Sequence, residues 1–97
     1  MKVYIAGPYT NGDVAVNVRT AMRVGLAEME KGHAVFIPHL AHFLHLLDPH
    51  PYTFWVKHDL LWVKECDKVI RIKGHSKGAD EEVAYAHELG ISVSVSE

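Results

Sequence analysis

The chain has 97 residues, 48% of them hydrophobic, and a formal net charge of −2 at pH 7. This length allows one domain with a modest core, which we take as residues 1–97. The nearly balanced charge and the lack of a basic block argue against a nucleic-acid polymer as a partner. We find no signal peptide or membrane span, and the single cysteine, Cys66, fits a buried thiol in a cytoplasmic protein.

The first half of the chain shows a strand–helix–strand pattern. An apolar run at residues 3–6 ends at Gly7-Pro8, and a second at residues 33–37 ends at Pro38. Between them, residues 11–13 read as a turn and helix cap, and an amphipathic stripe from Val14 to about Lys31 predicts a helix. This order predicts a parallel βαβ unit.

The second half repeats the alternation after an irregular segment. We expect a short helix at residues 41–47, chain breakers at 48–51, a helix at 54–64 and a buried strand at 68–72. A helix capped by Ser76 and closing at residues 89–90 follows, and residues 91–95 form a last strand, placed at a sheet edge. The fold class is therefore α/β: one doubly wound, flavodoxin- or Rossmann-like domain whose short parallel sheet of three to five strands is flanked by helices. Ligands of such sheets bind at the carboxyl ends of the strands, here residues 4–10, 38–39 and 73–78.

A glycine-bearing loop leads from the third strand into the helix capped by Ser76. Carboxylates at Asp80, Glu81 and Glu82 suit the positive end of a helix dipole. The loop and helix N-terminus can form a cradle for an anion or for sugar hydroxyls. An ordinary strand-to-helix connection with a well-capped helix explains the same residues.

Asp59 is a carboxylate among large apolar side chains of the predicted helix at residues 54–64. Its neighbours one turn away are Trp55, Val56, Trp62 and Val63. Partial burial would raise the pKa of Asp59 and suit it to hold or donate a proton. Alternatively, Asp59 lies solvated at the edge of the apolar stripe or caps a neighbouring element.

Glu82 is the candidate for a second carboxylate at the same sheet edge. Glu81 points roughly 100° away around the helix, so only one of the two is expected to face a pocket. Two carboxyl groups on either side of a pocket suggest glycosyl chemistry, in which one stabilises or attacks the anomeric carbon and the other handles the proton of the leaving group.

Short motifs follow one another in order along most of the chain. They are Tyr4-Ile5-Ala6-Gly7, His58-Asp59-Leu60, Cys66-Asp67 before a strand, and Ser76-x-Gly78-x-x-x-Glu82 followed by Ala86. With this ordered set the chain resembles the nucleoside 2-deoxyribosyltransferase-like superfamily, which includes nucleoside 5′-monophosphate N-glycosidases. The resemblance implies an enzyme without a cofactor that cleaves or transfers the N-glycosidic bond of a nucleoside, deoxynucleoside or 5′-monophosphate.

The resemblance also implies catalytic roles. Glu82 matches the nucleophile that forms a glycosyl–enzyme intermediate, Asp59 the aspartate that assists at the sugar and base, and Tyr4 the tyrosine that holds the nucleophile. A nucleophilic Glu82 must be ionised, which the helix N-terminus favours. We expect retention of the anomeric configuration, with the two carboxyl groups roughly 5 Å apart.

Substrate contacts are expected from the loops at the sheet edge. Ser76 and Gly78 match the loop that receives the 5′ end of the sugar or its phosphate. Further candidates are Gly7, Pro8, Tyr9, which could stack on a base, Asn17 on the first helix, and His39 at the end of the second strand.

The chain departs from the superfamily pattern in two ways. Its first loop is Pro8-Tyr9-Thr10, where monophosphate-cleaving relatives tend to carry serine and arginine, although Lys73, Lys77 or Arg19 could replace that charge. The chain is also shorter than typical members, so the residues that close their pockets are either absent or supplied by a second subunit. The resemblance implies a homodimer or higher homo-oligomer with the active site near an interface.

Two other functional classes stay open. Histidines at positions 39, 42, 45, 50 and 58 allow a metal-dependent protein, but their spacing lacks a zinc pattern, and a substrate-covering loop without metal is preferred. A non-catalytic nucleotide-binding module would need the cradle and Tyr9 but not the pair of Asp59 and Glu82.

Overall fold

The computed structural model describes residues 1–96 and contains a four-stranded sheet with helices around it. In chain order the elements are β1 (Lys2–Ala6), α1 (Val14–Glu30), β2 (Ala34–Phe36), the 3-10 helix η1 (Pro38–Leu40), α2 (Ala41–Leu47), α3 (Tyr52–Val63), β3 (Lys68–Ile72), α4 (Lys77–Glu88) and β4 (Ser92–Ser96). The predicted α/β class and strand–helix alternation are confirmed.

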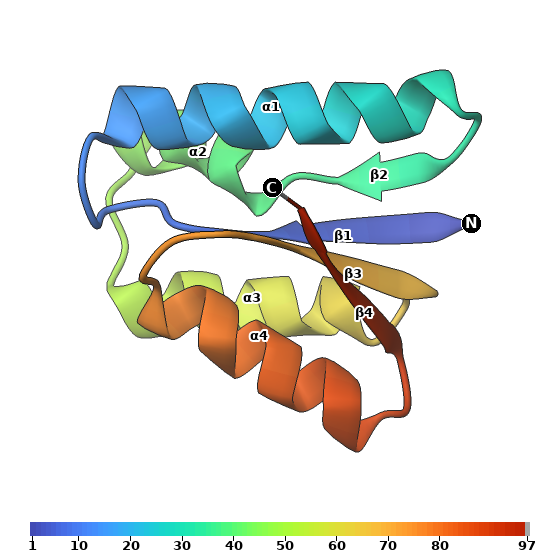
Figure 1. Ribbon diagram of the computed structural model, residues 1–97. Helices are drawn as coiled ribbons and strands as arrows, with labels where there is room; N and C mark the ends of the chain where they lie inside the picture. Colours follow the sequence, from blue (N-terminus) through green and yellow to red (C-terminus); the bar gives the residue numbers. More distant parts are fainter. Residues whose placement is uncertain (97) are drawn as a thin grey trace.

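All strand pairs of the sheet are parallel, in the order β2-β1-β3-β4. The chain leaves β1 toward β2 on one side and later returns to place β3 on the other side of β1. Figure 1 shows α1 on one face of the sheet, and α3 and α4 on the opposite face. The fold is therefore doubly wound, and β4 is an edge strand as the alternating sequence predicted.

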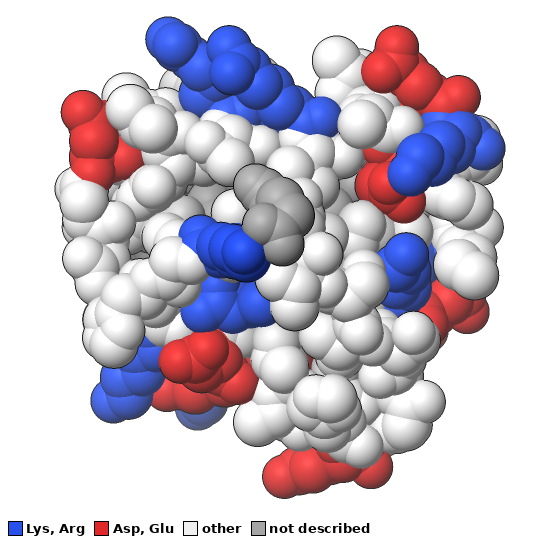
Figure 2. Space-filling model, viewed as in Figure 1, with Lys and Arg blue, Asp and Glu red and all other residues white. Residues whose placement is uncertain are grey.

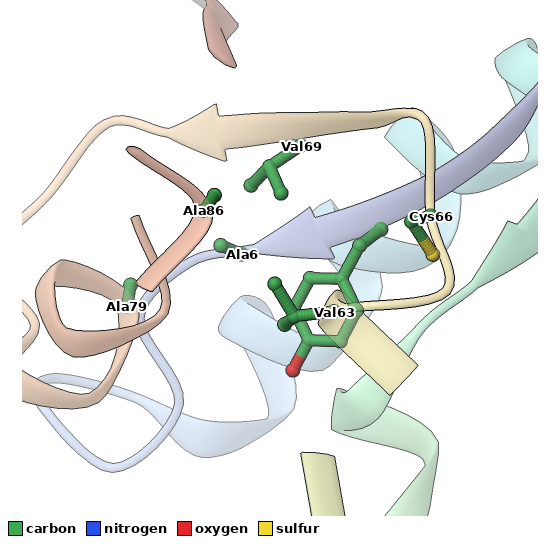
Figure 3. Close-up of a cluster of buried hydrophobic side chains, with 7 residues drawn as sticks. Ala6, Val63, Cys66, Val69, Ala79 and Ala86 are labelled. Carbon is green, nitrogen blue, oxygen red and sulfur yellow. The ribbon is translucent and has the colours of Figure 1, made fainter. Parts of the chain in front are cut away.

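Buried side chains form one apolar cluster on each face of the sheet. On the α1 face, Val3, Ile5 and Ile70 pack with Ala21 of α1. On the opposite face, β1 and β3 pack against α3 and α4, and Figure 3 shows Ala79 and Ala86 of α4 close to the strand residues Ala6 and Val69. The cluster on the second face also contains Tyr4 and the free thiol Cys66, which is buried as expected.

Several boundaries differ from the predicted ones for local reasons. The α3 helix begins at Tyr52, directly after Pro51 at the N-cap, instead of at residue 54. The β2 strand is shorter than predicted because the chain turns into η1 at Pro38. The predicted caps are confirmed: Asp13 accepts hydrogen bonds from the backbone of Ala15 and Val16, and Ser76 accepts one from Ala79 at 3.1 Å.

The surface carries mixed charge. On the face shown in Figure 2, lysine and arginine side chains of the described residues form separate groups interspersed with acidic ones, rather than one continuous basic band. Among residues 1–96, no helix has the length and apolar character needed to cross a membrane.

Candidate active site

A hollow of ≈ 670 Å³ lies where the loops after β1 and β3 meet α2, α3 and the start of α4. The adjacent strands β1 and β3 are followed by α1 and α4, which cover opposite faces of the sheet. The hollow therefore lies at the point where a doubly wound sheet binds ligands. Its lining residues are Gly7, Tyr9, Thr10, Asn11, Pro38, His39, Ala41, His42, His45, His50, Tyr52, Trp55, Val56, Asp59, His75, Ser76, Lys77, Gly78, Ala79 and Glu82.

Glu82 enters the hollow from the second turn of α4, whereas Glu81 does not line it. Burial raises the pKa of Glu82 to about 8, and the charge of Asp59 adds to the increase. The hydrogen bond from Tyr4 and the charge of Arg71 lower the pKa but do not outweigh burial. The expectation that the helix N-terminus keeps Glu82 ionised is wrong for the ligand-free protein at neutral pH, because loss of hydration dominates.

Asp59 lines the same hollow from α3, and 13% of its side chain is exposed. Burial raises its pKa to about 6, while the adjacent His58, whose Nδ1 lies 3.1 Å from Oδ1 of Asp59, lowers it. The prediction that partial burial raises the pKa of Asp59 is confirmed. The hollow therefore holds two carboxyl groups whose pKa values bracket neutral pH.

Polar contacts fix Glu82 and the loop beside it. The hydroxyl of Tyr4, a fully buried residue of β1, donates a hydrogen bond to Oε2 of Glu82. The guanidinium of Arg71 donates to the carbonyl oxygens of Ile72 and Gly74 and pairs with Asp80 at 3.0 Å. Arg71 thus ties the end of β3 to the first turn of α4.

One end of the hollow is formed by the N-terminus of α4. Ser76 caps this helix, and a Cβ atom added at Gly78 would lie 2.9 Å from the hydroxyl oxygen of Tyr52. Glycine at this position lets Tyr52 reach the helix from the start of α3.

Another part of the lining consists of aromatic and imidazole side chains. The Tyr9 hydroxyl lies 2.6 Å from Nδ1 of His42, and the indole nitrogen of Trp55 donates to Nδ1 of His45 at 2.9 Å. These contacts tie α2, none of whose residues is buried, to the first loop and to α3. Flat polarisable rings of this kind can stack on a planar base.

His39 of η1 also lines the hollow and is 5% exposed. Its Nε2 lies 3.2 Å from the carbonyl oxygen of Gly7 and 3.0 Å from that of Pro8, so Nε2 carries the proton and donates it. Burial lowers the pKa of His39, and among the described residues its Nδ1 has no hydrogen-bond partner.

Seven of the ten site residues predicted from the sequence line the hollow. They are Gly7, Tyr9, His39, Asp59, Ser76, Gly78 and Glu82. The other three lie behind it: Tyr4 contacts Glu82, Pro8 packs near Gly74, and Asn17 donates to the carbonyl oxygens of Tyr9 and Asn11 at 2.9 Å. The expectation that Pro8 and Asn17 face the hollow is therefore corrected, since both shape the first loop from behind.

The sequence patterns did not identify the face of α3 that lines the hollow. Tyr52, Trp55, Val56 and Asp59 line the hollow at helical spacing, so one face of α3 is the site face. The sequence contains this periodicity, but a helix predicted from residue 54 leaves Tyr52 outside it, and the pattern does not distinguish an aromatic side chain that lines a hollow from one that packs in the core.

The histidines make aromatic and hydrogen-bond contacts rather than a ligand cluster. His50 stacks on Phe54 with ring centroids 4.0 Å apart, and His58 lies beside Asp59. Within residues 1–96, no group of three or more His, Cys, Asp or Glu side chains is arranged to hold a metal ion. The alternative of a metal centre at residues 39–50 gains no support from this geometry.

A family model described as a domain of unknown function (DUF7768) matches residues 1–96. No sequence in the curated protein collection matches the chain.

Two solved structures share the fold. One is a 2-deoxyribosyltransferase from the psychrotolerant bacterium Bacillus psychrosaccharolyticus, with a TM-score of 0.73, 24% identity, and coverage of 98% of this chain and 71% of the other. The second is a 2-deoxyribosyltransferase from Leishmania mexicana, with a TM-score of 0.69, 19% identity, and coverage of 97% and 62%. This chain thus spans less than two thirds of the Leishmania chain. The likeness shows that the chain has a nucleoside 2-deoxyribosyltransferase-like fold.

Proposed function

The chain belongs to the family described as domain of unknown function DUF7768, and we propose that it cleaves or transfers the N-glycosidic bond of a nucleoside, deoxynucleoside or 5′-monophosphate. The observation that carries the proposal is the pairing of Glu82 and Asp59 in one hollow, both with pKa values raised by burial. The shared fold with 2-deoxyribosyltransferases supports the same chemistry.

The two parts of the lining suggest how a nucleoside lies in the hollow. The aromatic and imidazole part suits the base, whereas the capped N-terminus of α4 suits the oxygen atoms at the 5′ end of the sugar. The anomeric carbon then lies between these parts, where Glu82 and Asp59 enter.

In the proposed reaction, a carboxylate oxygen of Glu82 attacks the anomeric carbon while the bond to the base nitrogen breaks. The developing oxocarbenium charge is stabilised by this carboxylate, and Asp59 gives a proton to the departing base. The glycosyl ester on Glu82 is then opened by water, releasing the sugar, or by the nitrogen of a second base. Tyr4 keeps Glu82 oriented during both steps.

The resting protonation state is the reverse of the reactive one. Near neutral pH, burial favours a proton on Glu82 and leaves Asp59 ionised. The two groups repel each other when both are charged, so a proton placed on Asp59 lowers the free energy needed to ionise Glu82. The proposed reaction therefore requires that the proton held by Glu82 moves to Asp59 before Glu82 attacks.

One observation favours a non-catalytic nucleotide-binding module as the alternative. A protonated Glu82 is a poor nucleophile, and the hollow could bind a nucleotide without turning it over. That module has no need for a second buried carboxyl group at Asp59, so we prefer the enzyme.

We also propose a cytoplasmic homodimer or larger homo-oligomer. The α2 helix carries exposed apolar side chains beside the hollow, among them Phe43, Leu44, Leu46 and Leu47. A second copy packed on α2 would cover them and close the aromatic end of the site.

The test is incubation of the purified protein with nucleosides, deoxynucleosides and their 5′-monophosphates, with released base measured by chromatography. Addition of a second base separates transfer from hydrolysis, because only a transferase makes the new nucleoside. If no member of the panel releases base but thermal-shift measurements show binding, the non-catalytic module replaces the enzyme.

A further inference from the structure

Tyr52 spans the gap between the start of α3 and the start of α4. Its hydroxyl oxygen would lie only 2.9 Å from a Cβ atom at Gly78, and its ring lines the hollow. Although 57% of Tyr52 is exposed, its hydroxyl end is pressed against the α4 backbone. Tyr52 therefore occupies space directly beside the helix N-terminus.

The ionisable groups that act on the Tyr52 hydroxyl are carboxyl groups. Burial, followed by the carboxyl groups of Glu81, Glu82 and Asp59, raises the pKa of Tyr52, so the hydroxyl keeps its proton. A neutral hydroxyl in this place can donate to, and accept from, an alcohol.

Cationic groups near this end are few or already engaged. Arg71, the guanidinium nearest the loop, is 14% exposed at its side chain and bonds Ile72, Gly74 and Asp80. Of the lysines and arginines, Lys77 is the one that lines the described hollow, with His75 beside it. A lysine gives a single point charge rather than the two-pronged contact that arginine gives to phosphate.

We propose that Tyr52 makes this site selective for nucleosides with a free 5′-hydroxyl over nucleoside 5′-monophosphates. This inference rests on the proposed function, which places the 5′ end of the sugar at Ser76 and Gly78. A 5′-hydroxyl fits beside Tyr52 and exchanges a hydrogen bond with it. A phosphate would have to displace the ring, and it would bring close to two negative charges toward Glu81 and toward the pair of Glu82 and Asp59, in which one carboxyl group is ionised.

The experiment compares each nucleoside with its own 5′-monophosphate, using wild type, Tyr52→Ala, Tyr52→Phe and the adjacent control Thr53→Ala. Both kcat/KM for base release and Kd by calorimetry are measured, and thermal melting checks that each variant is folded. We expect wild type to favour the nucleoside by about 10-fold or more, and Tyr52→Ala to reduce that ratio by about 10-fold. Tyr52→Phe should weaken binding of the nucleoside about 3- to 10-fold, as expected for one lost hydrogen bond. Thr53→Ala should leave the ratio of nucleoside to monophosphate unchanged.

The outcomes separate this inference from the proposed chemistry. Turnover with equal or higher preference for the monophosphate overturns the role of Tyr52 and leaves the glycosyl chemistry standing. Selective binding of the nucleoside without any turnover supports the role of Tyr52 in selectivity and overturns the proposed glycosyl chemistry. A ratio that Tyr52→Ala does not change, or binding of neither compound, overturns the inference.

Discussion

The hydroxyl of Tyr4 on β1 donates a hydrogen bond to Glu82 on α4, 78 positions later in the chain. Tyr4 is fully buried in the centre of the sheet, so its hydroxyl is a fixed point from which Glu82 is held. The bond also lowers the pKa of Glu82, in opposition to burial. One contact thus both orients the carboxyl group and eases its ionisation.

Removal of this hydroxyl should slow the reaction without unfolding the protein. In Tyr4→Phe the ring still fills its place, but Glu82 loses a partner and its pKa rises further. We expect kcat to fall about 10-fold and the acidic limb of the pH–rate profile to move to higher pH. An unchanged profile would show that Tyr4 only packs in the core.

Glu82→Gln should abolish base release, with a loss of at least about 100-fold, because an amide cannot form the glycosyl ester. Glu81→Gln is the matched control, since its side chain is one residue away on the same helix and does not line the hollow. Equal losses in the two variants, measured by chromatography of the free base, would contradict the nucleophile assignment.

Asp59→Asn should remove the proton donor and slow release of an ordinary base about 100-fold or more. A p-nitrophenyl glycoside of the same sugar leaves without needing a proton, so its cleavage should fall far less. Comparison of the two substrates tests the role of Asp59 apart from its role in binding. Parallel losses for both substrates would point to a structural effect.

Stability should depend on pH through the buried carboxyl groups. The pKa of Glu82 is about 8 in the folded protein against an ordinary value of 4.5, so the folded state binds this proton more tightly than the unfolded state. The contribution to stability is complete below about pH 4.5 and is lost as the pH rises to about 8. Asp59, with a pKa of about 6 against 3.8, changes stability in the same direction.

Glu82→Gln should therefore be more stable than wild type at pH 8.5, by about 1 kcal/mol or more, which is roughly 4–8 °C in Tm for a domain of this size. The difference should shrink or vanish at pH 4.5. Thermal melts followed by circular dichroism at the two pH values measure it. A constant difference at both would mean that Glu82 does not titrate as its burial implies.

Self-association should depend on α2. Leu47, with 83% of its surface exposed, would be covered by a second copy, so Leu47→Glu should shift the protein toward monomer in analytical ultracentrifugation. Val16→Glu changes an exposed apolar residue of α1 and is the control. A wild-type protein that is monomeric at high concentration would rule out the homo-oligomer.

Much of the fold was predictable because its signals are local. Apolar runs ending at glycine or proline marked β1, β2 and β3, and side-chain caps at Asp13 and Ser76 marked the starts of α1 and α4. The expectation that Asp59 has a raised pKa also followed from neighbours one helical turn away.

The remaining features depend on contacts between distant segments. The protonation of Glu82 follows from burial beside Asp59, and helix position alone gave the opposite answer. Asn17 is polar and near the site, but only the folded loop shows that it bonds Tyr9 and Asn11. The place of Tyr52 against Gly78 likewise arises from the packing of α3 on α4.

The central claim, a covalent glycosyl intermediate on Glu82, is tested most directly by intact-protein mass spectrometry with a 2′-fluoroarabinosyl nucleoside. The fluorine destabilises the oxocarbenium-like transition states of both steps, formation of the glycosyl ester and its breakdown. The ester should therefore accumulate when its breakdown becomes the slower step. We expect a mass gain of one fluorinated sugar, mapped by peptide digestion to Glu82 and missing in Glu82→Gln. Base release without any adduct, or an adduct on another residue, would contradict the account.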